Sequence, residues 1–365
     1  MKIKRSNNLP NISDLFSYGM GKNFTNEGKN FAFDNCMEFL IEKLSGNQKL
    51  DYWIITGITG NGYTPVYSKN DTATTCEYCV SGYLAGPDYT GYVFDAIGYG
   101  HTYVTAEQLN AEKPIYIQKL TDCIDRGIPV IVISISNASD FFIDSLTHYL
   151  YVGQEDYEKA SLFSRKADAA LYDKLDAMKF IPQNWIFAGE KKRDIALADI
   201  CRNAVMKIPY WLTLPERNGV FFGASAYRAW ADDIKAGRYD SEIDAWHHYR
   251  VYICNLATIA WANNVNDAPY ASIINRLAQI DPQYADMNAR IAEQYYKLGE
   301  ESGSSGWCKS GIWKELEELG GGLNNYSRDA FRDKEKSANI AAKFYEAADC
   351  IDEVVRICRN FSIIK

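Results

Sequence analysis

One cysteine of this chain has the local setting of a nucleophile. Cys36 lies in segment 33–46, which has the pattern of one short helix. Asn35 is a favourable N-cap, and Glu38 follows at the spacing of a capping box. This pattern predicts Cys36 in the first helical turn, where unpaired N–H groups and the helix dipole favour the thiolate. Glu38 acts in the opposite direction because it is a negative charge. The alternative for Cys36 is an inert buried thiol.

One histidine stands out as a base for this thiol. His148 lies within segment 145–153, which has the pattern of a β-strand. A thiol at a helix start facing an imidazole on a strand is the papain-like arrangement, in which the imidazole takes the thiol proton. A structural core histidine is the alternative, and His101 stays a second candidate. His247 and His248 lie inside a helical pattern and point in different directions, which predicts structural or surface roles.

The first half of the chain predicts a small sheet with few helices. A helix is expected over 113–126, with Pro114 in its first turn and Gly127 just after its end. A shorter helix is expected to end at Gly98. The extended segments are 51–56, 128–135, 145–153, 159–163 and 184–189. These elements predict an N-terminal helix followed by a small, mostly antiparallel sheet.

The second half has a different character, because its apolar residues recur with the period of an α-helix. The segments with this period are 194–207, 223–237, 241–263, 268–280, 285–299 and 334–359. We therefore expect an α+β protein with two domains. Residues 1–193 form the catalytic domain with the sheet, and residues 194–365 form an all-helical domain.

The composition of the chain argues against several classes of function. The net charge is −8, which disfavours sequence-independent binding of nucleic acid or an anionic membrane. No apolar run is long enough to span a bilayer. The nine cysteines are scattered, which favours reduced thiols and a cytoplasmic location. We expect no metal or nucleotide cofactor, because HExxH, paired CxxC and P-loop motifs are absent.

Several short motifs resemble one bacterial papain-fold family. This family includes the bacteriocin-processing double-glycine peptidases and the N-terminal domain of the butirosin acyltransferase. The segments that carry the resemblance are 36–46 (CMEFLIEKLSG), 57–63 (GITGNGY), 127–132 (GIPVIV), 147–153 (THYLYVG), 189–192 (GEKK) and 222–230 (FGASAYRAW). The last two resemble the helical extension of the butirosin-type relatives, so the resemblance spans nearly the whole chain.

The resemblance implies a papain-like cysteine fold and a set of catalytic residues. Cys36 matches the nucleophile and His148 matches the base. The third member of the triad is Asp168, with Asp156 as its competitor. The resemblance also makes the side-chain amide of Asn30 an oxyanion donor, beside the backbone N–H of Cys36.

The same resemblance implies cysteine-dependent acyl transfer. Butirosin-type relatives move an acyl group from a carrier-protein thioester to an amine, and thioamide-antibiotic condensing enzymes look like a further analogue. We therefore expect an acyl carrier protein and a small amine as partners, with docking at a basic surface. The candidate surfaces are 191–193 and the cluster Lys2, Lys4 and Arg5. The alternatives are a cysteine peptidase or amidase, and a non-catalytic binding protein on the same fold.

Overall fold

The computed structural model describes most of the chain of 365 residues. The described residues are 31–45, 50–70, 79–136, 145–151, 184–240, 248–249, 252–253, 255–256, 259, 273–302 and 306–363. Within them the protein is mixed α+β, mostly helical, with a small antiparallel sheet. This bears out the α+β class that the sequence predicts.

The chain divides into two compact units. The sheet unit comprises Met1–Ile55, Ala73–Glu77 and Leu84–Ile195. The helical unit comprises Thr56–Thr72, Tyr78–Tyr83 and Ala196–Lys365. The expected division between residues 193 and 194 falls two residues before the last segment of the helical unit. The helical unit also contains two stretches of the N-terminal half, Thr56–Thr72 and Tyr78–Tyr83. A single boundary in the sequence cannot assign these stretches to it.

Four antiparallel strands form the sheet of the sheet unit, in the order β2-β5-β3-β4. Their bounds are β2 (Tyr99–Thr105), β3 (Val130–Ser136), β4 (Ser145–Tyr151) and β5 (Asn184–Lys191). The strand predictions at 128–135, 145–153 and 184–189 are confirmed. Strand β2 was not predicted, because its sequence lacks the apolar run that marks β3. It pairs with β5 along most of its length.

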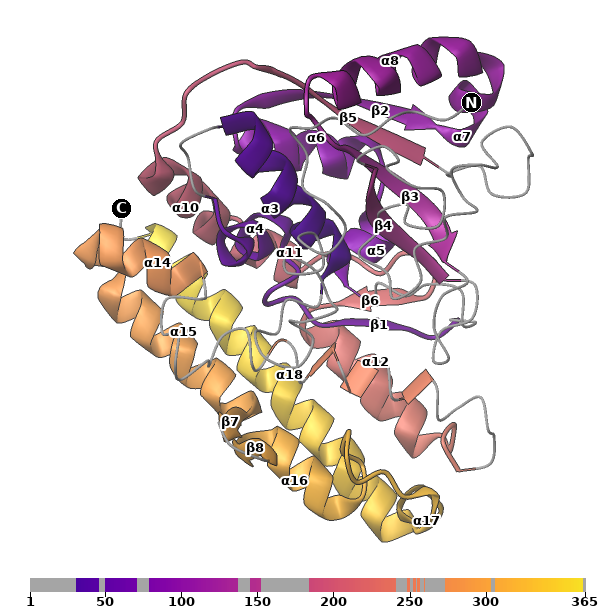
Figure 1. Cartoon of the computed structure of the whole chain (residues 1–365). Helices are drawn as coiled ribbons and strands as arrows, with labels where there is room; N and C mark the ends of the chain where they lie inside the picture. Colours follow the sequence, from indigo (N-terminus) through magenta and orange to yellow (C-terminus); the bar gives the residue numbers. More distant parts are fainter. Residues whose placement is uncertain are drawn as a thin grey trace. The chain divides into compact units, whose positions relative to one another are not determined.

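The helices of the sheet unit connect and cover these strands (Figure 1). Their bounds are α3 (Ala32–Ser45), α6 (Pro87–Ala96), α7 (Ala106–Ala111) and α8 (Lys113–Asp125). Helix α8 confirms the prediction for 113–126. It carries Pro114 in its first turn and is followed by Gly127 at a φ of 74°. The short helix expected before Gly98 is α6, and its C-cap is Ile97.

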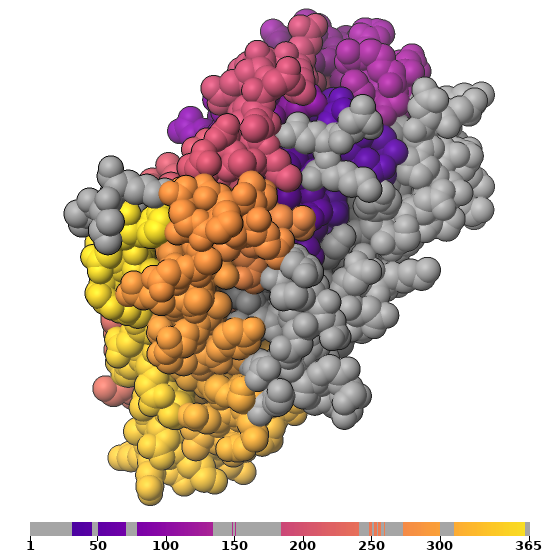
Figure 2. All heavy atoms as spheres, turned by 90° about the vertical axis from the view of Figure 1, so that its left-hand side faces the viewer, coloured from indigo at the N-terminus to yellow at the C-terminus, as the bar shows by residue number. Residues whose placement is uncertain are grey.

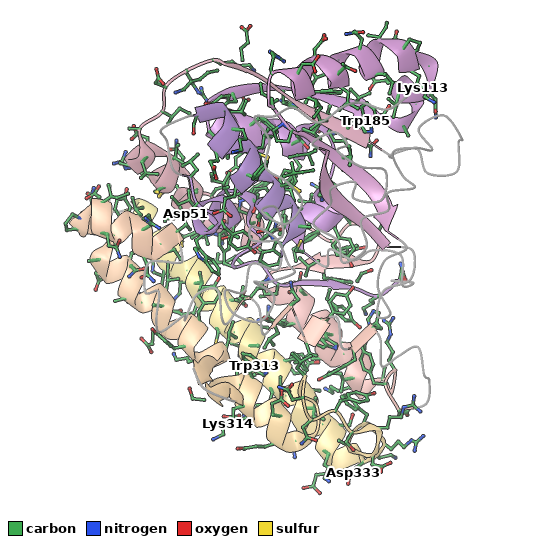
Figure 3. The ribbon with its side chains drawn as sticks, viewed as in Figure 1. Asp51, Lys113, Trp185, Trp313, Lys314 and Asp333 are labelled. Atoms are coloured by element: carbon green, nitrogen blue, oxygen red, sulfur yellow. The ribbon has the colours of Figure 1, made fainter. Side chains whose placement is uncertain are left out.

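The prediction of an extended segment at 51–56 is wrong, because these residues begin α4 (Tyr52–Thr59). The backbone N–H of Ile54 donates to Asp51 Oδ1 at 3.1 Å, so Asp51 acts as the helix N-cap. Asp51 is labelled in Figure 3. The β-branched residues of this segment favoured a strand, but the cap and the apolar spacing of a helix prevail here.

The helical unit is built around the long helix α18 (Lys334–Ile363), which packs against α12 (Ala224–Lys235) and α15 (Ala285–Leu298) (Figure 1). The side chains of α14 (Ile273–Ile280), α15 and α18 lie beside one another on the face in Figure 2. Asp333 caps α18, since its Oδ1 accepts from the N–H groups of Glu335 and Lys336 (Figure 3). The helices predicted over 194–207, 223–237, 285–299 and 334–359 are confirmed.

The expectation that residues 194–365 are entirely helical is wrong. Strand β6 (Val220–Phe222) pairs antiparallel with β1 (Val66–Ser68), and β7 (Glu300–Ser302) pairs with β8 (Gly306–Ser310). Such short strands escape a search for helical periodicity, because three residues carry almost no pattern. The remaining labelled helices of this unit are α5 (Val80–Leu84), whose last residue falls in the other unit, α10 (Leu197–Met206), α11 (Ile208–Leu212), α16 (Gly311–Leu319) and α17 (Arg328–Arg332), with a 3₁₀ turn at Pro282–Tyr284. In the part of the chain that is described, no helix has the length and apolar character to cross a membrane.

Candidate functional site

Helix α3 begins one turn earlier than the sequence predicts. The helix starts at Ala32, so Cys36 is its fifth residue and lies in the second turn. Asn35 is not the N-cap: its backbone N–H and its side-chain Nδ2 both donate to the carbonyl of Phe31, at 3.1 and 3.2 Å. Only the first four N–H groups of a helix lack a partner within it. The N–H of Cys36 is therefore not one of these four groups, and its role as an oxyanion donor stays a prediction.

Two hydrogen bonds connect the start of α3 to the start of α4. The backbone N–H of Phe31 donates to the hydroxyl of Tyr52 at 3.0 Å. The backbone N–H of Tyr52 donates in turn to Glu38 Oε1 at 3.0 Å. Glu38 therefore serves the N-terminus of α4, where a negative charge is favourable, and not a capping box with Asn35. Tyr52 was not identified from the sequence as a partner of α3. The N-cap residue Asp51, just before it, was the sign that a helix begins here.

His148 lies on β4, directly opposite Ile133 of β3, and its side chain is 3% exposed. Helix α3 packs against β4. The imidazole ring lies 4.7 Å from the ring of Phe33, measured between centroids, with 54° between the planes. Phe33 also contacts Tyr89 of α6, at 5.9 Å. The face of α3 that carries Phe33 is thus the face that meets the predicted base.

Cys36 lies on that same face of α3. Residues three apart on a helix are neighbours on its surface, so the positions of Phe33 and Cys36 are adjacent. Both side chains are buried, and Cys36 has 0% exposure. The structure therefore brings the helix of the predicted nucleophile against the strand of the predicted base. Phe33 connects the two elements through its contact with His148, and it was not identified from the sequence. Its spacing of three residues from Cys36 was the sign that both lie on one face of the helix.

Other candidate residues of the site lie outside the described residues. These are Asn30, Asp156 and Asp168, together with the predicted strand 159–163 and the basic cluster Lys2, Lys4 and Arg5. Their predicted roles stay predictions.

The second candidate base, His101, is on a different strand from His148. It lies on β2, and β2 and β4 are the two outer strands of the described sheet. Its ring stacks on Phe94 at 5.3 Å with 20° between the planes. Burial and the charge of Lys192 lower the pKa of His101. The contact between α3 and β4 favours His148 over His101 as the partner of Cys36.

The basic run 191–193 is largely offset by nearby acceptors. Lys191 pairs with Asp194, and Lys192 Nζ lies 3.7 Å from a carboxylate oxygen of Asp95. Arg193 Nη2 donates to the backbone carbonyl of Asp95 at 2.8 Å. Two carboxylates thus lie among three cations, which weakens the positive field that an acidic partner would meet.

The described cysteines and carboxylates give no indication of a metal centre. The side chains of six of the nine cysteines are described, and all six are buried thiols: Cys36, Cys79, Cys123, Cys201, Cys350 and Cys358. Among the residues placed by the structure, no three His, Cys, Asp or Glu side chains gather in a group that could hold a metal ion.

Comparison with known proteins gives no family assignment. No protein-family model matches the sequence, and no curated protein matches it.

Proposed function

We propose that this protein is a papain-like cysteine acyltransferase that forms an amide from a carrier-bound acyl thioester and an amine. One observation carries the proposal: the helix of Cys36 packs on the strand of His148, and Phe33, one turn before Cys36, contacts the His148 ring. Cysteine acyl transfer needs a thiol within hydrogen-bond reach of an imidazole base, and a helix and a strand that pack together can supply such a pair. The papain-like fold itself is part of this proposal.

The reaction has two transfers at one sulfur atom. His148 takes the proton of the Cys36 thiol, and the thiolate attacks the carbonyl carbon of the donor thioester. The carrier thiol leaves with a proton, and the acyl group stays on Cys36. The amine then attacks this new thioester, His148 takes the proton of the amine, and Cys36 is released as the amide forms. No cofactor takes part in this sequence.

Burial of the pair supports transfer over hydrolysis. Cys36 and His148 are almost fully excluded from solvent, and the ring of Phe33 covers the imidazole. Water must be kept from an acyl-cysteine if an amine is to capture it. A peptidase or amidase on the same fold has to admit water to the carbonyl carbon of the acyl-cysteine. The burial of this pair therefore supports the proposed acyltransferase over a peptidase or amidase.

The remaining parts of the proposed site follow from the family resemblance. Asp168, or its competitor Asp156, would orient the His148 ring, and the Asn30 amide would donate to the oxyanion. The partners would be an acyl carrier protein and a small amine, in a cytoplasmic biosynthetic pathway. The carrier would have to dock elsewhere than 191–193 alone, because carboxylates offset that run.

The test uses an acyl-pantetheine thioester, which presents the carrier's reactive group without the carrier. We expect the acyl group on the peptide that contains Cys36, read by mass spectrometry of the intact and digested full-length protein. An added amine should remove the acyl group as an amide. Cys36→Ala should abolish labelling, and Cys123→Ala is the matched control, because Cys123 is a buried thiol of the same unit.

Three other results would each contradict the proposal. A free acid as the main product in the presence of amine would favour the peptidase or amidase. Labelling that survives Cys36→Ala would remove this residue from the site. No labelling at any cysteine, together with no reaction of Cys36 with a small alkylating agent, would favour a non-catalytic binding protein.

A further inference from the structure

Four side chains of the helical unit form a hydrogen-bonded chain that the proposed acyl transfer does not use. His248 Nδ1 lies 2.9 Å from the hydroxyl of Tyr239. That hydroxyl lies 3.0 Å from the hydroxyl of Tyr67, which donates to Asp233 Oδ2 at 2.5 Å. His248, Tyr239 and Tyr67 are buried, whereas Asp233 retains 15% side-chain exposure. The chain therefore runs from a buried imidazole to a carboxylate near the surface.

The backbone fixes where the proton of a neutral His248 must lie. His248 Nε2 is 2.8 Å from the carbonyl oxygen of Ser68 in β1. A carbonyl oxygen only accepts hydrogen bonds, so Nε2 carries a proton. In a neutral imidazole, Nδ1 is then an acceptor, and the Tyr239 hydroxyl has to donate to it.

The other end of the chain is an ionised carboxylate. Arg238 Nη1 donates to Asp233 Oδ2 at 2.7 Å, and Lys69 Nζ lies 3.4 Å from Oδ1. Burial acts to raise the pKa of Asp233, but hydrogen bonds from Tyr67 and Arg238 and the charge of Lys69 outweigh it and lower the pKa. An ionised carboxylate only accepts, so the 2.5 Å contact requires the hydroxyl proton of Tyr67.

These assignments leave the chain one proton short. Three contacts join the four groups, but the two hydroxyl protons are committed to the outer two. The middle contact, between the hydroxyl oxygens of Tyr67 and Tyr239, then has no proton between its atoms. A proton added at Nδ1 of His248 would complete the chain. His248 would donate to Tyr239, Tyr239 to Tyr67, and Tyr67 to Asp233.

We propose that the chain from His248 to Asp233 is a binding site for one proton, taken up at Nδ1 of His248 in the folded protein. Uptake turns the Tyr239 hydroxyl from His248 toward Tyr67 and leaves the outer bonds to Ser68 and Asp233 in place. The completed chain connects β1, α12 and the helical residues 248–249. The protonated state thus differs from the neutral one in the direction of one hydroxyl.

The surroundings decide how acidic the solution must be for uptake. Among the residues that the structure describes, the groups that face His248 are Tyr67, Tyr239, Tyr252, Arg238, Asp233 and the Ser68 carbonyl, with Lys69 beside Asp233. Burial and the charge of Arg238 lower the pKa of His248 to about 4, and Ser68 and Asp233 act against them. His248 therefore takes up its proton only in acidic solution.

The test follows the four histidines by NMR in the full-length chain, labelled with ¹⁵N-histidine. His248→Gln identifies the resonances of His248. At neutral pH we expect Nε2 protonated and Nδ1 bare. Acidification should protonate Nδ1 while circular dichroism shows an unchanged fold. Tyr67→Phe should lower the proton affinity of His248 about tenfold, because the charged state loses the acceptor for Tyr239. Tyr83→Phe is the control, since the Tyr83 hydroxyl lies 3.0 Å from that of Tyr252, which is not one of the four groups.

Three results would overturn the proposal. The first is a proton on Nδ1 at neutral pH in the unaltered chain, which needs no variant to fold. The second is an equal effect of Tyr67→Phe and Tyr83→Phe on the proton affinity of His248. Loss of the fold before His248 takes up its proton would also exclude a proton site in the native state.

Discussion

The ring of Phe33 on α3 lies 4.7 Å from the imidazole of His148 on β4, inclined by 54°. The contact joins two residues that are far apart in the sequence and belong to different kinds of element. It lies on the face of α3 that meets β4, and Cys36 lies on that face one turn later. The geometry of the proposed site therefore depends on this aromatic contact.

Phe33→Leu tests this contact directly. We expect the proton on Cε1 of His148 to shift in the NMR spectrum, because the neighbouring ring is gone. The free energy of unfolding should fall by about 1–2 kcal/mol, from the lost ring contact and a small cavity. Phe39→Leu is the matched control, since Phe39 is another fully buried phenylalanine of α3. An equal shift of the His148 signal in both variants would contradict the arrangement.

Tyr52→Phe tests the unexpected start of α3. The variant leaves the buried N–H of Phe31 without the acceptor that it has at 3.0 Å. Burying an unsatisfied donor costs about 1–3 kcal/mol, which chemical denaturation would measure. Glu38→Gln keeps an acceptor for the Tyr52 N–H and loses only the charge near the α4 terminus, at a cost of about 0.3–1 kcal/mol. A larger loss of stability in Glu38→Gln than in Tyr52→Phe would argue against these hydrogen bonds.

Gly223→Ala tests the tight entry into α12. Gly223 has a φ of 61° and a ψ of −139°, and an added Cβ would overlap the carbonyl oxygen of Leu212. Gly237, with a φ of 82°, is the control, because its added Cβ would meet only the Asp240 side chain, at 2.9 Å. We expect Gly237→Ala to cost about 1–2 kcal/mol in unfolding free energy. Gly223→Ala should cost at least twice as much, since backbone has to move. Equal thermal unfolding of the two variants would refute the close approach.

His248 should make the stability of the protein depend on pH in a defined window. Burial lowers its pKa to about 4 in the folded chain, against about 6.5 in the unfolded chain. Between these values the unfolded state binds more protons, so stability falls as the pH falls from about 6.5 to 4. The loss should be up to about 3 kcal/mol for a shift of this size.

His248→Gln supplies the comparison for that window. Glutamine does not titrate, so the dependence of unfolding free energy on pH between about 4 and 6.5 should become flatter. Chemical denaturation at a series of pH values would measure it. An unchanged slope in His248→Gln would mean that other groups produce the acid sensitivity.

The sequence by itself determined the elements with strong local patterns. The apolar run of β3 and the proline and glycine at the ends of α8 were sufficient for correct predictions, because strand burial and helix ends depend on nearby residues. The long helices α15 and α18 were predicted for the same reason. The candidates Cys36 and His148 also came from the sequence, through residue type and local pattern.

Only the tertiary structure decided the start of α3, the helical state of α4 and the pairing of β2. Each depends on a partner distant in the sequence: Tyr52 accepts from Phe31, Glu38 accepts at the start of α4, and β5 pairs with β2. The same holds for the chain from His248 to Asp233, whose hydrogen bonds connect β1 with α12. Local propensity differs little between the alternatives at such places, so the contacts made on folding determine the outcome.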